Sequence, residues 1–233
     1  MNTRARVLEA LSEVHDPELD EPITSLGFVT SCAVSPDGDV EIALRLPTPQ
    51  CAPNFAYLMA ADARNVLRRL PDVRRIDVRL EDHYTGDEIN AAIARGEGFT
   101  GAFPGETDDD RLDALRELFQ RKALVARQAR LCEALLTDGA TPEQVTARRV
   151  ADLPDLADTR RCLELRRRLG ITCHQGSSAF VAPNGEPLAA HELTRWLRKA
   201  RLVRTSLEVN GSICRSLLQI RSQRAAELEE VGK

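Results

Sequence analysis

The chain has 233 residues, of which 42% are hydrophobic and 29% are charged, with 32 Lys and Arg against 36 Asp and Glu. This length suits one large domain or two small ones, and ordinary numbers of glycine and proline exclude collagen-like and disordered classes. No apolar run approaches the roughly 20 residues of a membrane-spanning helix, and no apolar stretch resembling a secretory signal follows the N-terminus. We therefore expect a cytoplasmic protein with no membrane partner.

Charge and cysteine content indicate two units in a reducing compartment. Residues 1–120 carry 12 basic and 23 acidic side chains, whereas residues 121–233 carry 20 and 13. Such asymmetry predicts two units with different surfaces. The six cysteines are dispersed and form no Cys-x-x-Cys pair, so reduced thiols are expected.

The first 81 residues alternate between helical and strand patterns. Apolar residues recur at helical spacing over 7–14 and 53–70, and they alternate with polar residues over 28–34, 40–46 and 76–80. The first two strands form a hairpin, and the helix after them places the third strand parallel to the second. We predict a two-layer α/β domain over residues 1–81, in the order helix, hairpin, helix, strand.

The rest of the chain is predicted to be mainly helical, so the fold class is α+β. Residues 82–107 form an acidic connector with a short helix near 87–94, and residues 108–233 form a helical domain. Within that domain the expected helices lie at 109–136, after a capping box at Thr141, before Gly170, at 191–201 and at 205–228. Asn184-Gly185 predicts a hairpin turn, and Asn210-Gly211 indicates a break or a close helix crossing.

Cys51 is the residue with the clearest chemical potential. It lies in Pro47-Thr48-Pro49-Gln50-Cys51-Ala52-Pro53, between the end of a strand and the start of a helix. Free N–H groups at a helix start stabilise a thiolate, which can bind a metal or transfer a sulfur-bound cluster. The alternative is a buried thiol that only fills space.

Two acidic stretches are candidates for further metal ligands. Asp16-Pro17-Glu18 follows His15 in a loop that can face the same sheet edge as Cys51, and such mixed ligands suit iron or zinc. The alternative is a turn capped by the Asp16 side chain. The second stretch, Asp82-His83 with Asp87-Glu88, could extend a metal site or be a polar loop whose acids favour a helix N-terminus.

The order of these motifs resembles a known family. The motifs in this chain are, in order, Leu11, Val14, Asp16-Pro17-Glu18, Leu26-Gly27-Phe28-Val29, Thr48, Cys51, Pro53 and Leu70-Pro71-Asp72-Val73. This series, over about residues 5–80, is similar to the iron–sulfur cluster assembly family, the domain of unknown function fifty-nine with its SufT- and PaaD-like members. The family's adjacent cysteine and proline are separated here by Ala52.

The resemblance implies an α/β fold and a role in the maturation of metalloproteins. Cofactor-binding residues would be Cys51, Asp16, Glu18 and Thr48, and iron would be bound by Cys51, Asp16, Glu18 and His83. The stretch from Asp82 onward resembles a longer subgroup associated with multicomponent di-iron monooxygenases, which implies such an enzyme as client. Iron or an iron–sulfur cluster would then be held transiently.

The basic C-terminal half allows a different interpretation. Six arginines at 166, 167, 168, 195, 198 and 201 could contact nucleic-acid phosphates, although a solvated helical face or docking to an acidic protein explains them better. A faint likeness to tyrosine recombinases fails because this half contains no tyrosine. Cys162 and Cys214 lie among apolar helix positions and are predicted to pack in a core, as is Trp196.

The sequence therefore favours a maturation factor over an enzyme, because no nucleophile–base set and no glycine-rich phosphate loop are present. The alternatives are a metal-free chaperone or adaptor for an oxygenase subunit and, less favoured, a DNA-binding regulator. Expected partners are a client metalloenzyme or other assembly proteins, with a homodimer as a further option and nucleic acid disfavoured.

Overall fold

The computed structural model describes residues 3–231 of the chain. Its residues divide into two compact units. Unit 1 combines the residues up to Ala114 with those from Asn210 onward, and unit 2 is Leu115–Val209. Among the described residues, no helix combines the length and the apolar character needed to cross a bilayer.

The elements of unit 1 follow the predicted order. They are α1 (Thr3–Leu11), β1 (Val29–Val34), β2 (Asp39–Arg45), α2 (Pro53–Leu67), β3 (Arg75–Glu81), α3 (Gly86–Arg95), α4 (Phe99–Ala102), the start of α5 (Asp113–Thr137) and the last part of α8 (Ala190–Val231). The sheet order is β1-β2-β3, with β1 antiparallel and β3 parallel to β2. The predicted α+β fold with a parallel third strand is thus confirmed.

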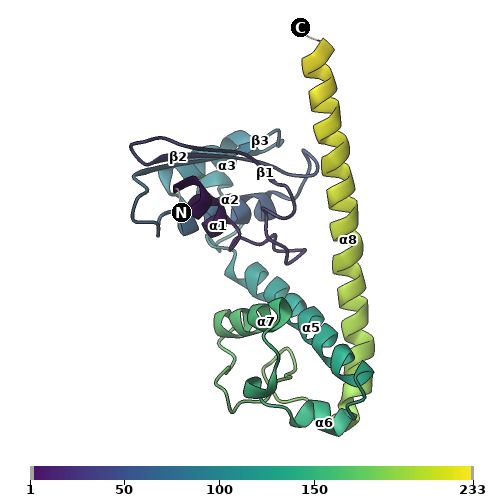
Figure 1. Ribbon diagram of the computed structural model, residues 1–233. Coiled ribbons are helices and arrows are strands. Elements are labelled where there is room, and N and C mark those ends of the chain that lie inside the picture. The colour runs from purple at the N-terminus through teal and green to yellow at the C-terminus, as the bar shows by residue number, and fades with distance from the viewer. Residues whose placement is uncertain (1–2, 232–233) are drawn as a thin grey trace. The chain divides into compact units, whose positions relative to one another are not determined.

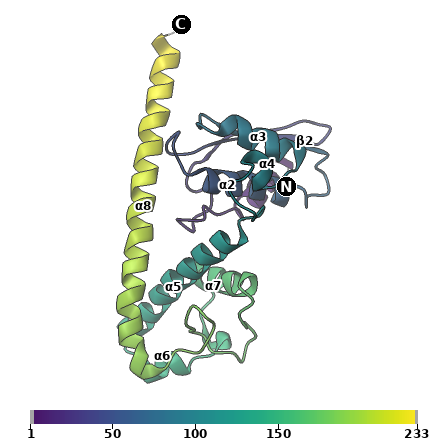
Figure 2. The same ribbon diagram turned by 180° about the vertical axis from the view of Figure 1, so that it is seen from behind.

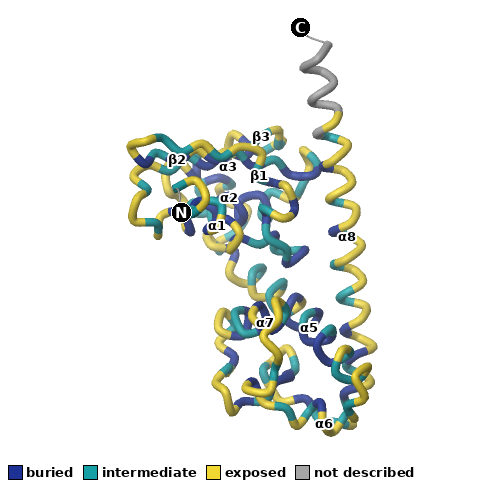
Figure 3. The backbone as a smooth tube through the Cα atoms, in the orientation of Figure 1, coloured by how far each residue is buried: buried dark blue, intermediate teal, exposed yellow. Residues whose placement is uncertain are grey.

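The sheet of unit 1 has one covered face. Helices α2 and α3 lie on the same side of it in both views (Figures 1 and 2). Alternation along β2 places Val40, Ile42 and Leu44 in the core, each at most 2% exposed, while Glu41 faces water. Figure 3 colours the backbone by burial and shows buried stretches along the strands and helices of unit 1 and exposed ones at its outer loops. This core fixes the ends of β2 and β3, where the candidate site lies.

The hairpin between β1 and β2 depends on Gly38. Its φ is +87°, a left-handed conformation that side chains disfavour. A Cβ at this position would lie 2.5 Å from the backbone oxygen of Asp72. Glycine is therefore required at position 38 for two reasons, the left-handed backbone conformation and the close Asp72 carbonyl oxygen.

Unit 2 is helical and has its own core. Its elements are the remainder of α5, α6 (Pro142–Ala147), the 3-10 helix η1 (Val150–Asp152), α7 (Ala157–Arg168) and the first part of α8. Cys162 is 3% exposed in this core and Trp196 packs against it, as predicted. A turn with Gly185 at φ +89° joins the bridge between Val181 and Pro187, where Asn184-Gly185 predicts one.

Two predictions for the C-terminal half are wrong. The helices expected at 191–201 and 205–228 are one continuous helix, α8. The Asn210-Gly211 pair does not break it; instead Gly211 is buried, and a Cβ there would lie 3.4 Å from Glu21 Oε1. The second option for this pair, a close helix crossing, does not describe it either, because Glu21 belongs to the loop between α1 and β1.

Arg166 also departs from expectation, because it is 1% exposed and cannot contact a phosphate at the surface. Its guanidinium donates to the carbonyl oxygens of Ser178, Ala179 and Thr172. Among the other arginines of that set, Arg168 pairs with Glu164 and Arg201 with Glu133. Packing therefore accounts for Arg166, and surface pairing within unit 2 accounts for Arg168 and Arg201.

The capping box predicted at Thr141 is confirmed and can be tested. Thr141 Oγ1 accepts the N–H of Gln144 at 3.3 Å, and Gln144 Oε1 accepts the N–H of Thr141 at 2.8 Å. We expect Thr141→Ala to lower the free energy of unfolding of unit 2 by about 1 kcal/mol. Urea unfolding followed by the fluorescence of Trp196 measures this. Thr137→Ala, at an exposed position, is the control, and equal losses in both variants would contradict the capping role.

Candidate functional site

Cys51 lies where the sequence predicts it, in the loop between β2 and α2. It is a free, half-buried thiol, and α2 begins two residues later at Pro53. Its Sγ is 3.5 Å from Thr48 Oγ1, and its N–H donates to the Thr48 carbonyl oxygen at 3.3 Å. The N-cap residue Ala52 provides no side-chain cap, and within the first turn of α2 the N–H of Phe55 donates to Asn54 Oδ1 at 2.9 Å. Thr48 and Cys51 are therefore brought together at an uncapped helix start.

His83 supports this loop through the backbone of Cys51. Its Nε2 lies 2.7 Å from the Cys51 carbonyl oxygen, so this ring nitrogen is the donor. Its Nδ1 is 3.1 Å from Thr85 Oγ1. Burial lowers the pKa of His83, the hydrogen bond to Cys51 raises it, and Arg221 lowers it further. With both nitrogens engaged, His83 holds the loop in this structure.

Asp16 is a buried carboxylate in the loop after α1. It is 8% exposed, and its Oδ1 accepts the N–H groups of Glu18 at 2.9 Å and Leu19 at 2.8 Å. Burial raises the pKa of Asp16 to about 6, the two hydrogen bonds oppose this, and the charges of Glu18 and Glu21 add to it. The capped turn foreseen as the alternative for Asp16 is therefore present.

Glu18 contacts an element that the sequence pattern did not associate with it. Its Oε1 accepts a hydrogen bond from Asn210 Nδ2 of α8 at 3.2 Å. Nearby, Arg215 of α8 pairs with Glu21 at 2.7 Å. The Asp16–Glu18 loop thus packs against the part of α8 that belongs to unit 1.

The same part of α8 also reaches the loops after β2 and β3. Arg221 donates to the carbonyl oxygens of Leu46 at 2.6 Å and Asp82 at 2.7 Å, and it lies 3.0 Å from the Asp82 carboxylate. The N–H of Tyr84 donates to the Pro49 carbonyl oxygen at 3.0 Å. These contacts join the loops that carry Cys51 and His83.

Cys214 is the site residue that sequence reasoning placed wrongly. It was expected to pack in a core with Leu217 and Leu218, but it is half-buried in unit 1. Burial, together with the charges of Asp16, Cys51 and Glu18, raises the pKa of Cys214 to about 11. The spacing of Asn210, Cys214 and Arg221 predicts that they share one face of a helix. It does not predict which part of the protein that face contacts.

The predicted ligands surround one junction of loops without forming a closed set. Cys51 and Thr48 come from the β2–α2 loop, Asp16 and Glu18 from the loop after α1, and His83 from the loop after β3. In the part of the chain that the structure describes, no group of three or more His, Cys, Asp and Glu side chains is arranged to hold a metal ion. The reactive group at this junction is the Cys51 thiol, in a loop whose backbone is held by hydrogen bonds to Thr48 and His83.

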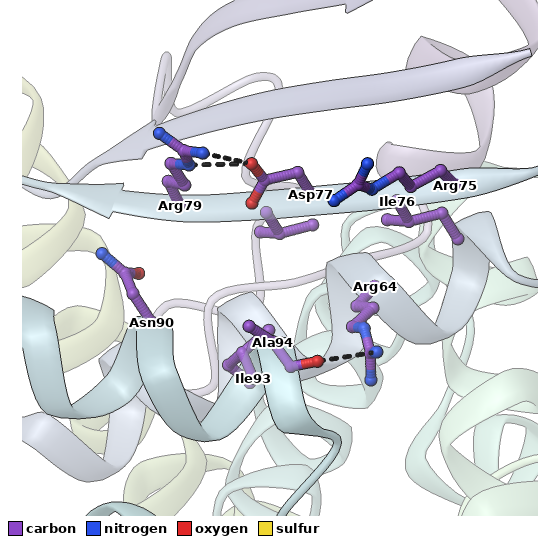
Figure 4. A pocket seen from close by; sticks show the side chains of 9 residues that line it. Arg64, Arg75, Ile76, Asp77, Arg79, Asn90, Ile93 and Ala94 are labelled. Carbon is purple, nitrogen blue, oxygen red and sulfur yellow. Dashed lines mark hydrogen bonds and ion pairs between the residues drawn. The ribbon is translucent and has the colours of Figure 1, made fainter.

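A hollow in unit 1 lies along β3, away from the predicted site residues, and is lined largely by polar and charged side chains. Arg64, Arg75, Asp77, Arg79 and Asn90 are among the residues that line it (Figure 4). Asp77 pairs with Arg79, and Arg64 donates to the Ala94 carbonyl oxygen. None of the predicted site residues lines this hollow.

Three findings relate the chain to known proteins. Residues 4–78 match the family described as iron–sulfur cluster assembly protein. An uncharacterized protein of Methanocaldococcus jannaschii is 30% identical over 97 residues, which are 42% of this chain and all of that protein. The iron–sulfur cluster carrier protein of Deinococcus radiodurans is 38% identical over 76 residues, which are 32% of this chain and 20% of the carrier. The family match includes Asp16, Glu18, Thr48 and Cys51, and it ends before His83.

Proposed function

Because the chain belongs to the family of iron–sulfur cluster assembly proteins, we propose that it takes up iron or an iron–sulfur cluster at Cys51 and delivers it to a client enzyme. The observation that carries this proposal is the position of Cys51. It is a free, half-buried thiol at an uncapped helix start, within the family-matched region.

Delivery needs a ligand that can be exchanged. In the proposed step the Cys51 thiol loses its proton and its Sγ binds iron, while the donor's thiolate leaves the iron and takes up a proton. No electrons are transferred, and the reverse exchange releases the cargo to the client. Cys51 lies two residues before the start of α2, and Thr48 Oγ1 lies within hydrogen-bond reach of its Sγ.

The surrounding residues would position Cys51 without closing the site. His83 holds the Cys51 carbonyl, and Asp16 orders the neighbouring turn through two backbone N–H groups. A structural metal site is closed by four protein ligands, whereas a carrier needs open positions for exchange. We assign Asp16, Glu18 and His83 to this positioning role and Cys51 to direct binding.

The uptake step is tested by anaerobic reconstitution of the full chain with ferrous iron and sulfide. Wild type should acquire iron-dependent visible absorbance. Cys51→Ser should retain at least about tenfold less iron, because loss of a second-shell partner alone costs that much. Cys32→Ser is the matched control, since Cys32 is also a half-buried free thiol but lies on β1. Equal iron retention in wild type and Cys51→Ser would remove Cys51 from the function, and no absorbance in any of them would favour a metal-free adaptor.

For the client we propose a multicomponent di-iron monooxygenase, as the longer subgroup suggests. Cells that carry Cys51→Ala should then yield a client with less iron than cells that carry Cys32→Ala. Metal analysis of the purified client measures the difference. Unchanged iron in the oxygenase would reject it as the client without affecting the uptake test.

A further inference from the structure

The last part of α8 presents one face to the loops of unit 1. Gly211 and Leu218 on this face are buried, whereas Ile213, Leu217 and Ile220 are 53%, 39% and 48% exposed. Residues three, four and seven apart share a face of a helix, so Cys214 lies on the buried face. Its neighbours on that face determine what the thiol meets.

These neighbours enclose Cys214 between the two loops of the candidate site. One turn before it, Asn210 bonds Glu18. One turn after it, Leu218 is the nearest side chain to Gly27, at 3.6 Å from where a Cβ would lie. Two turns after it, Arg221 bonds the Leu46 carbonyl at the start of the loop that carries Cys51. Cys214 therefore faces the space between the Asp16–Glu18 turn and the Cys51 loop.

We propose that Cys51 and Cys214 together form a two-thiol site for iron or an iron–sulfur cluster, and this inference rests on the proposed function. The charges that act on the Cys214 thiol come first from Asp16, then from Cys51 and Glu18. The contacts of α8 with Glu18 and with Leu46 place the same two loops on either side of Cys214. Cys214 lies outside the family-matched residues 4–78, so the second thiol is a feature of the longer chain.

Two thiols suit a carrier better than one or four. Iron–sulfur clusters are commonly held by four thiolates. A single thiol gives a weak hold, and four would occupy every position that a donor or client must use. A pair retains the cargo and leaves the other positions to the protein that gives or receives it. On uptake each cysteine loses a proton to a thiolate that it displaces, and on delivery each takes up a proton from a client thiol, so both steps balance without a redox partner.

The pairing is tested first with phenylarsine oxide, which condenses with two neighbouring thiols and releases water. We expect the folded full chain to take up one phenylarsenic group, measured as a mass increase that a dithiol reverses. Cys51→Ser and Cys214→Ser should both lose this uptake, and Cys32→Ser should keep it. The buried pair Cys132 and Cys162 is the competing site, and capture that survives both serine variants would overturn the proposal.

The ligand role is tested by the same iron and sulfide reconstitution. If the inference holds, Cys214→Ser retains less iron than wild type and shows a changed absorbance spectrum, while Cys32→Ser matches wild type. Full retention in Cys214→Ser with loss in Cys51→Ser would overturn the two-thiol site and leave the proposed function intact. Full retention in both serine variants, or no iron uptake by wild type, would overturn the two together.

Discussion

Asp16→Asn is expected to stabilise unit 1 at neutral pH by about 1–3 kcal/mol in the free energy of unfolding. Burial raises the pKa of Asp16 from 3.8 to about 6, and a difference of that size corresponds to about 3 kcal/mol. Asparagine keeps an oxygen that can accept the N–H groups of Glu18 and Leu19, and it has no charge to bury. The variant therefore keeps the hydrogen bonds of the turn and removes the free-energy cost of burying a charged carboxylate.

The sign of the pH dependence follows from the same values. Between about pH 4 and pH 6 the folded state holds a proton on Asp16 that the unfolded state has released. Stability attributable to this group is thus highest below about pH 4, falls as the pH rises, and is lowest above about pH 6. Asp16→Asn should lack this decline.

Thermal unfolding of unit 1 can be followed by tyrosine absorbance, because Tyr57 and Tyr84 are the only tyrosines and both lie in this unit. The control is Asp37→Asn in the exposed hairpin turn, which should change stability by less than about 0.5 kcal/mol. A destabilised Asp16→Asn at neutral pH, or an unchanged slope between pH 4 and 6, would show that the carboxylate is held by contacts that outweigh its burial. The stabilisation, if found, marks Asp16 as a charge retained for function at the expense of stability.

Arg166→Ala is expected to destabilise unit 2 by about 3 kcal/mol or more. The side chain is 1% exposed and donates to the carbonyl oxygens of Ser178, Ala179 and Thr172. Removing it leaves these acceptors without that donor and opens a cavity, and each lost bond to a charged group costs about 1.5–3 kcal/mol. The segment 172–179 would lose its hydrogen bonds to the Arg166 guanidinium of α7.

The neighbouring residue provides the control for this variant. Arg167 is exposed on α7, so Arg167→Ala should change stability by less than about 0.5 kcal/mol. Urea unfolding followed by fluorescence reports on unit 2 alone, because Trp196 is the only tryptophan. Equal midpoints for the two variants would refute the anchoring role of Arg166.

Local pattern was sufficient for most of unit 1. Alternation over 40–46 and 76–80 indicated two buried strands, and the intervening helix required them to be parallel, as β2 and β3 are. The turn at Asn184-Gly185 and the cap at Thr141 were predictable because they depend on a few adjacent residues. The proposed division of the chain at residues 81 and 107 stays a prediction.

The errors share a physical cause, which is tertiary contact. Glycine weakens an isolated helix by about 1 kcal/mol, yet α8 continues through Gly211, where Asn210 contacts Glu18 and Arg215 contacts Glu21. Arg166 reads as a surface charge in sequence, but carbonyl groups that follow α7 satisfy it inside the core. Neither contact is visible in the spacing of neighbouring residues.

The candidate site divides in the same way. Cys51 was predictable from its place before a helix start and Thr48 from the family resemblance, and the Asp16 turn was predictable because Oδ1 bonds residues that directly follow it. The contribution of α8 was missed because its contacts join residues far apart in the chain, such as Glu18 with Asn210. Helical spacing identified the face of α8, but only the fold could identify what that face covers.

One practical consequence arises from the split composition of unit 1. A fragment that stops at Ala114 would keep every family-matched residue and yet omit the guanidinium that bonds Leu46 and Asp82. Glu18 and Glu21 would lose their partners as well, and their carboxylates would be left to water. Experiments on such an excised domain would therefore describe these loops without the contacts that they have in the full chain.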